Sequence, residues 1–124
     1  MTIELLKGSV DNHIHCCPHI NKRSTNIFEV VNQAEKIQMY GIGLMDNFSN
    51  TSGYASLIKK YKPKLKLKIF GGLIMEPPSG GVNYENAKIA LNYSYNSNEG
   101  AKFISFPTHH TRHVAKQEKR KKNI

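Results

Sequence analysis

The stretch at residues 24–45, STNIFEVVNQAEKIQMYGIGLM, decides the fold because it reads as a helix followed at once by a buried strand. Ser24 or Thr25 is the expected N-cap of the helix, and Gly41 is the expected glycine just after its C-terminus. Residues 42–45 are apolar or glycine and predict a short strand. The helix should bury one stripe of apolar side chains at helical spacing: Ile27, Val30, Val31, Ala34 and Ile37.

The rest of the chain continues this alternation of strands and helices. Apolar or alternating runs predict the strands, and turn clusters rich in Pro and Gly separate them from helical segments. The further strands are expected at residues 5–15, 65–75 and 101–106, and the further helices at residues 54–62 and 83–96. Asn83 is the expected N-cap of the helix at residues 83–96. The chain after Thr108 is expected to begin as a helix and then to fray into the tail. The order β-α-β-α-β-α-β predicts an α/β fold of parallel βαβ units.

The composition fits one modest globular domain of 124 residues, with 39% hydrophobic residues and no Trp. No apolar run approaches the roughly 20 residues of a membrane helix, and the N-terminus lacks the basic and apolar regions of a secretory signal. We therefore expect a cytoplasmic protein without a membrane partner. Cys16 and Cys17 are adjacent, which would strain a disulfide between them, so we expect two reduced thiols.

The net charge of +9 is concentrated toward the C-terminus. Residues 112–124 hold six basic residues and one acidic residue, and they predict a basic, disordered tail after a folded domain at residues 1–111. Such a tail can also hold phosphate-bearing partners by electrostatic attraction. The body lacks interleaved aromatic and basic residues of the RNA-binding type, so we do not expect a nucleic-acid partner.

Polar side chains follow each predicted strand at the point where it ends. The carboxyl ends of parallel strands meet at one edge of a sheet, so these side chains should gather there. The first strand leads into Asp11, His13 and His15, the second into Asp46 and Asn47, the third into Glu76, and the fourth into Thr108, His109, His110 and His113.

His13 and His15 form an HxH pair with a physical meaning on a strand. Residues two apart lie on the same face, while the intervening Ile14 faces the other way. Two neutral imidazoles can hold one divalent ion, and Zn²⁺ suits them best. Asp11 lies two residues before His13, so we place it on the same face, where it would ligate the ion or orient a histidine.

Simpler structural interpretations stand beside this one. His19 lies in a loop and is expected at the surface. Asp46 could serve only to cap the segment that follows it, and Glu76 could be a solvated turn residue before two prolines. His109 and His110 are adjacent, so at most one of them would face a given ion in an extended conformation.

Four segments carry a family resemblance: DNHIH at residues 11–15, EVVNQAEKIQMYGIGLMDN at 29–47, KIFGGLIMEPPSGGVNYENAKIAL at 68–91 and GAKFISFPT at 100–108. In this order they resemble an uncharacterised branch of the amidohydrolase-like metal-dependent hydrolases. The resemblance covers residues 8–108. It implies a TIM-barrel type of fold with a metal centre at the carboxyl ends of the strands.

The resemblance also implies a chemistry. A water molecule whose pKa is lowered by Zn²⁺, Mn²⁺ or iron would attack a small-molecule substrate with an amide, ester, lactone or other C–N or C–O linkage. His13 and His15 would be the ligands from the first strand. Together with the strand-end reasoning, the candidate metal ligands are His13, His15, Asp11 and His109, and the candidate catalytic residues are Asp46 and His110.

The chain departs from the family pattern in two ways. That branch has a Lys and a nearby His after its second strand, where this chain has Asp46 and Phe48. A complete barrel takes about 250 residues, whereas this chain predicts four strands and hence half a barrel. We therefore expect a truncated hydrolase that is incomplete or depends on homo-oligomer formation. The alternative is a non-catalytic remnant or interaction module of the family.

Overall fold

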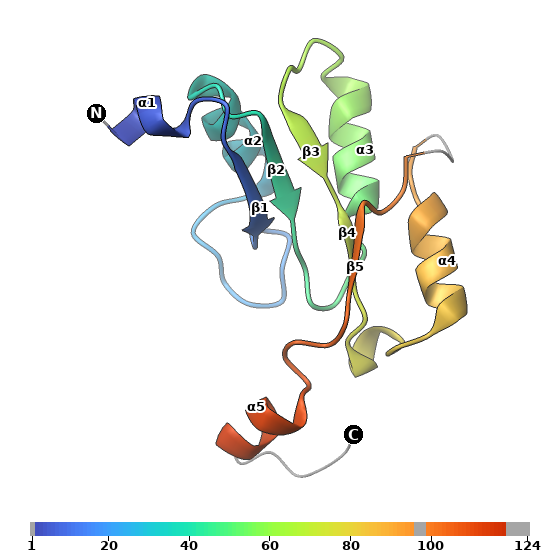
Figure 1. The fold of residues 1–124 in the computed structure, drawn as a ribbon. Coiled ribbons are helices and arrows are strands. Elements are labelled where there is room, and N and C mark those ends of the chain that lie inside the picture. Colours follow the sequence, from blue (N-terminus) through green and yellow to red (C-terminus); the bar gives the residue numbers. More distant parts are fainter. Residues whose placement is uncertain (1, 96–98, 119–124) are drawn as a thin grey trace.

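The computed structural model describes residues 2–95 and 99–118 (Figure 1). The described chain alternates strands with helices along most of its length. The strands are β1 Val10–Ile14, β2 Gly41–Leu44, β3 Lys68–Phe70, β4 Gly72–Ile74 and β5 Phe103–Ser105. The helices are α1 Thr2–Leu6, α2 Ile27–Lys36, α3 Ser52–Tyr61, α4 Tyr84–Asn92 and α5 Arg112–Gln117, with a 3-10 turn at Pro77–Ser79.

All strand pairs are parallel, which confirms the predicted α/β fold of βαβ units. One sheet has the order β1-β2-β3, and β4 pairs with β5 in a second sheet. In Figure 1 the arrowheads of β1 and β2 point to the same edge of the sheet, where the loops toward the candidate site begin. The described strands do not close into a barrel.

The third predicted strand is divided into β3 and β4 at Gly71. A Cβ atom at Gly71 would lie 2.5 Å from the backbone of Ser52, so the start of α3 packs directly on this point. The neighbouring Thr51 hydroxyl donates to the Leu44 carbonyl at 2.7 Å and accepts from the Gly72 amide at 2.9 Å. This buried side chain therefore joins the end of β2 to the start of β4.

The predicted limits of α2 are corrected at both ends. The N-cap is Asn26 rather than Ser24 or Thr25. Its side chain accepts from the Glu29 amide, and its own amide donates to the Glu29 carboxylate, which together form a capping box. The helix ends at Lys36 with Ile37 as its C-cap, so Gly41 does not directly follow its C-terminus. Gly41 begins β2 instead, where a Cβ atom would lie 2.9 Å from the Phe70 ring.

The hydrophobic core consists of two clusters. The larger one lies between β1, β2 and β3 and the helices α2 and α3, and it includes Val31, Ile42, Leu44, Ile58 and Ile69. The smaller one lies under α4 and contains Leu73, Met75, Ala90 and Ala101. The apolar stripe predicted for α2 is confirmed at Ile27, Val31 and Ala34, which are buried, while Val30 and Ile37 are half-buried.

The start of the chain differs from the sequence expectation, whereas the helix near its C-terminus agrees with it. Residues 5 and 6, predicted to start a strand, belong to α1, and the strand starts only at Val10 after Gly8 with φ +74°. The helix expected after Thr108 is α5, whose N-cap Thr111 accepts from the Val114 amide. Residues 119–124 of the predicted disordered tail lie outside the described residues. Asn83 caps α4 as predicted.

None of the helices that the structure describes is long and apolar enough to cross a membrane.

Candidate functional site

The two histidines of the HxH pair meet at the carboxyl end of β1. The Nε2 atoms of His13 and His15 lie 3.1 Å apart, and their ring centroids are 5.1 Å apart. His13 is exposed and His15 is half-buried. The sequence expectation that both rings share one side of the strand end therefore agrees with the observed contact.

Asp11 was predicted to lie on the same face as the two histidines, and the structure corrects this. Asp11 pairs with Ile42, and Ile14 pairs with Leu44. The segment from Asp11 to Ile14 on β1 is therefore one residue longer than the segment of β2 that faces it. The extra residue is a β-bulge, which breaks the period-two alternation on which the prediction rested. The carboxylate of Asp11 accepts a hydrogen bond from the backbone amide of His13 at 3.1 Å instead.

His19 was expected at the surface, and the structure corrects this. Its side chain is only 1% exposed, and its ring lies 5.6 Å from that of His15, edge to face. The loop that carries it is closed by two backbone hydrogen bonds, from Cys17 to Thr25 and from Ile27 to Cys17. Loop closure of this kind depends on chain contacts that the local sequence does not signal.

Asp46 follows β2 and lies beside His19. Its Oδ1 atom is 3.9 Å from Nε2 of His19, which in turn lies 3.1 Å from Nη2 of Arg23. Asp46 also accepts from the Phe48 amide at 2.8 Å and from the Ser49 hydroxyl at 2.9 Å. Asp46 thus caps the following turn, as the simpler interpretation held, and is also part of the histidine cluster.

The surroundings of the His15 imidazole disfavour its charged form. Burial lowers its pKa, and electrostatic interactions with His13, Arg23 and His19 lower it further, against a smaller opposing effect of Asp46. Its Nδ1 atom is buried without a hydrogen-bond partner. A neutral imidazole keeps one ring nitrogen as an acceptor, which is the form that binds metals.

Glu76 forms a second centre at the ends of β4 and β5. Its side chain is fully buried rather than solvated. The Oε1 atom accepts from the amides of Thr108 at 2.9 Å and His109 at 2.7 Å, and from Asn47 Nδ2 at 3.2 Å. The Oε2 atom accepts from the His110 amide at 3.0 Å. One carboxylate therefore organises the whole turn after β5.

These donors set the ionisation of Glu76. Burial by itself would raise its pKa, but the backbone amides of His109, Thr108 and His110 and the side chain of Asn47 lower the pKa to about 2. Glu76 is consequently an anion at neutral pH, and its charge is matched by fixed N–H groups.

Glu76 also orients His110. The Nδ1 atom of His110 lies 3.0 Å from Oε2 of Glu76, the arrangement in which a carboxylate fixes an imidazole ring. His109 does not share this contact, although its ring packs edge to face on that of His110 at 5.1 Å. Phe48 lies against both rings, at 6.2 and 6.1 Å.

The predicted gathering of polar residues thus takes the form of two clusters. One contains His13, His15, His19 and Asp46, and the other contains Glu76, His110, Asn47 and Thr108. Within residues 2–95 and 99–118, no group of three or more His, Cys, Asp or Glu side chains is arranged to hold a metal ion. Cys16 and Cys17 are free thiols as expected, and burial raises the pKa of Cys16.

The fold and these clusters define an α/β protein whose titratable side chains meet where its parallel strands end. The chain belongs to a family of unknown function (DUF6282), which matches residues 8–124. The match therefore includes the basic C-terminal segment together with the βαβ units. No curated protein and no solved structure matches the chain.

Proposed function

We propose that the protein is a metal-dependent hydrolase of the amidohydrolase-like class, acting on a C–N or C–O bond of a small molecule. The observation that carries the proposal is the pair of imidazole nitrogens, His13 Nε2 and His15 Nε2, which face each other at the end of β1. A bound divalent ion would polarise the substrate and lower the pKa of a water molecule.

The spacing of the two nitrogens fits a shared ion. Two Zn–N bonds of about 2.0–2.1 Å at a tetrahedral angle place their nitrogens about 3.3 Å apart. The observed separation is 3.1 Å. His13 and His15 are therefore the proposed ligands, for Zn²⁺ first and Mn²⁺ or iron next. Asp11 and His109 are not included, because the Asp11 carboxylate bonds the His13 backbone amide and the His109 ring packs on Phe48 and His110.

The proposed catalytic residues act from the two clusters. Asp46 would accept a proton from the attacking water, since its carboxylate is buried beside His19. His110 would deliver a proton to the leaving group, because Glu76 holds its Nδ1 and thereby orients the ring. A positioned acid or base of this type accelerates hydrolysis by roughly 100-fold to 10,000-fold.

Elemental analysis of the purified protein tests the metal site. We expect about one zinc, manganese or iron per chain, and loss of this metal in the His13→Ala, His15→Ala double variant. The matched control is His113→Ala, which removes an exposed histidine of α5 and should keep the metal. Circular dichroism of all three proteins separates loss of ligands from loss of fold.

Metal-loaded protein is then screened with esters, lactones and amides. Hydrolysis that falls at least 100-fold in His110→Gln, with metal content unchanged, would assign His110 to the chemical step. Metal-free protein, even after incubation with Zn²⁺ or Mn²⁺, would contradict the proposal.

The second candidate function is a non-catalytic interaction module. The specific observation in its favour is that, in the part of the chain described by the structure, no three His, Cys, Asp or Glu side chains are arranged to hold a metal ion. It predicts no metal in wild-type protein and no change of binding partners in the double histidine variant. Affinity purification with the wild-type and double-variant chains would test the second point.

A further inference from the structure

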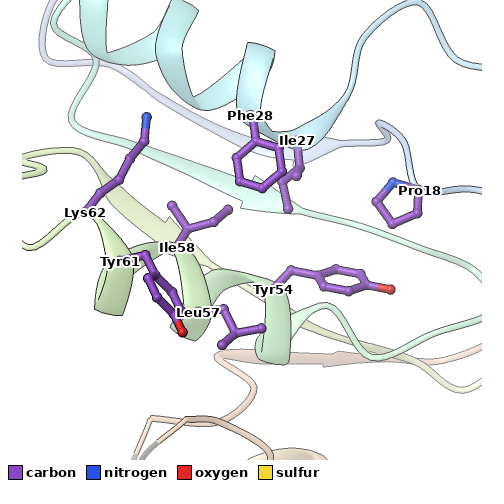
Figure 2. Close-up of a pocket in the computed structure, with 8 residues that line it drawn as sticks. All are labelled: Pro18, Ile27, Phe28, Tyr54, Leu57, Ile58, Tyr61 and Lys62. Carbon is purple, nitrogen blue, oxygen red and sulfur yellow. The ribbon is translucent and has the colours of Figure 1, made fainter.

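An apolar groove lies between α2 and α3, on the helical side of the molecule (Figure 2). Its volume is about 550 Å³, within the range of sites that bind small organic ligands. It is formed by Pro18, Ile27, Phe28, Tyr54, Leu57, Ile58, Tyr61 and Lys62. None of these residues is a proposed metal ligand or catalytic residue, so the groove is independent of the hydrolase proposal.

The groove has a buried floor and exposed walls. Ile27 and Ile58 form the floor and are 7% and 5% exposed. Phe28 from α2 and Leu57 and Tyr61 from α3 stand on either side in Figure 2, and each keeps between 45% and 79% of its surface exposed. Covering these side chains would remove apolar surface from water, which favours binding of an apolar chain.

One end of the groove carries a positive charge. Lys62 reaches across from α3 toward α2, and its Nζ donates to Asn32 Oδ1 at 2.6 Å. An ammonium group has three N–H donors, so it can donate to an anion in addition to Asn32. The residues that line the groove include no acid.

The sequence around Lys62 is also rich in lysine. Residues 59–68 contain six lysines and no acidic residue. Lys59 is paired with Glu99 at 3.1 Å, but Lys64, Lys66 and Lys68 are exposed. Lys62, the lysine among the groove residues, favours an anionic head group over a neutral or cationic one at this end.

We propose that the groove binds an amphiphilic monocarboxylate of the fatty-acid class. The hydrocarbon chain lies on Ile27 and Ile58 between the walls, and the carboxylate accepts from Nζ of Lys62. The apolar lining supplies most of the affinity, and the charge-assisted hydrogen bond at Lys62 supplies the selectivity for an anion.

Titration calorimetry with three ligands of one chain length tests the proposal: decanoate, 1-decanol and decyltrimethylammonium, each as a monomeric solute. We expect decanoate to bind at least tenfold more tightly than either other ligand, with a negative heat-capacity change. Lys62→Gln should weaken decanoate binding about tenfold and leave decanol binding unchanged. Lys88→Gln, at an exposed position of α4 outside the groove, is the matched control and should behave as wild type.

A second variant keeps the test independent of Lys62. Leu57→Glu introduces a carboxylate at an exposed wall position, so the fold should survive while decanoate binding is lost. Three results would overturn the proposal: equal affinity for decanoate and decyltrimethylammonium, a dimer that Leu57→Glu dissociates in the absence of decanoate binding, or binding to phosphatidylglycerol vesicles without binding of decanoate.

Discussion

The carboxylate of Glu76 lies 3.0 Å from Nδ1 of His110 and is at the same time fully buried. A carboxylate in such a place is stable only because fixed donors surround it. The turn after β5 supplies them, and in doing so it brings residues 108–110 onto the end of β4. The hydrogen bonds of Glu76 therefore hold the turn after β5 against the end of β4, and one of them also orients His110.

We expect Glu76→Gln to destabilise the fold by about 2–4 kcal/mol. The neutral amide replaces one acceptor oxygen with an NH₂ group, which faces the N–H donors of Thr108, His109 or His110. Urea unfolding followed by circular dichroism measures the change. Glu85→Gln, an exposed residue of α4, is the control and should shift stability by less than about 0.5 kcal/mol. Equal stability of the two variants would contradict the role of Glu76.

The stability of the protein should depend on pH through Glu76. Its pKa is lowered from 4.5 to about 2 in the folded state, so the unfolded chain binds a proton first as pH falls. The contribution of Glu76 is thus present above about pH 4.5 and is lost progressively as pH falls toward 2. When fully present, this contribution of Glu76 to the free energy of unfolding is about 3 kcal/mol.

The measurement is the free energy of unfolding in urea between pH 7 and pH 3. We expect the wild type to lose more stability over this interval than Glu76→Gln does. Parallel pH profiles for the two proteins would show that another group carries the dependence.

Thr51→Val should destabilise the protein by about 2–3 kcal/mol. The substitution keeps the shape of the side chain but removes the hydroxyl that joins the Leu44 carbonyl to the Gly72 amide. Both backbone groups would be left buried without this partner. Thr51→Ser retains the hydroxyl and should recover most of the loss, as judged by thermal unfolding. A Ser variant as unstable as the Val variant would assign the effect to the methyl group instead.

Asn26→Ala should cost about 1 kcal/mol of stability. Asn26 accepts from the Glu29 amide at 3.0 Å, and its own amide donates to the Glu29 carboxylate at 2.8 Å. Ser24→Ala is the informative comparison, because local sequence predicts Ser24 as a cap and the structure does not use it. Chemical denaturation of the two variants distinguishes the cap positions: a larger loss in Ser24→Ala would favour the sequence expectation over the observed capping box.

The sequence by itself determined the alternation of strands with helices after α1, the parallel α/β architecture, the buried stripe of α2 and the Asn83 cap. These features depend on the periodicity of apolar residues and on turn residues, which act between near neighbours in the chain. The adjacency of His13 and His15 followed in the same way, because residues two apart on an extended strand share a side.

Tertiary structure alone decided the remaining parts of the site. The bulge that separates Asp11 from His13 exists only because β1 must pair with β2. Glu76 becomes a buried anion only when a turn more than 30 residues later places its amides around the carboxylate. His19 is buried because a loop closes on Cys17. Desolvation and long-range hydrogen bonding depend on which segments meet in space, and local sequence patterns do not contain that information.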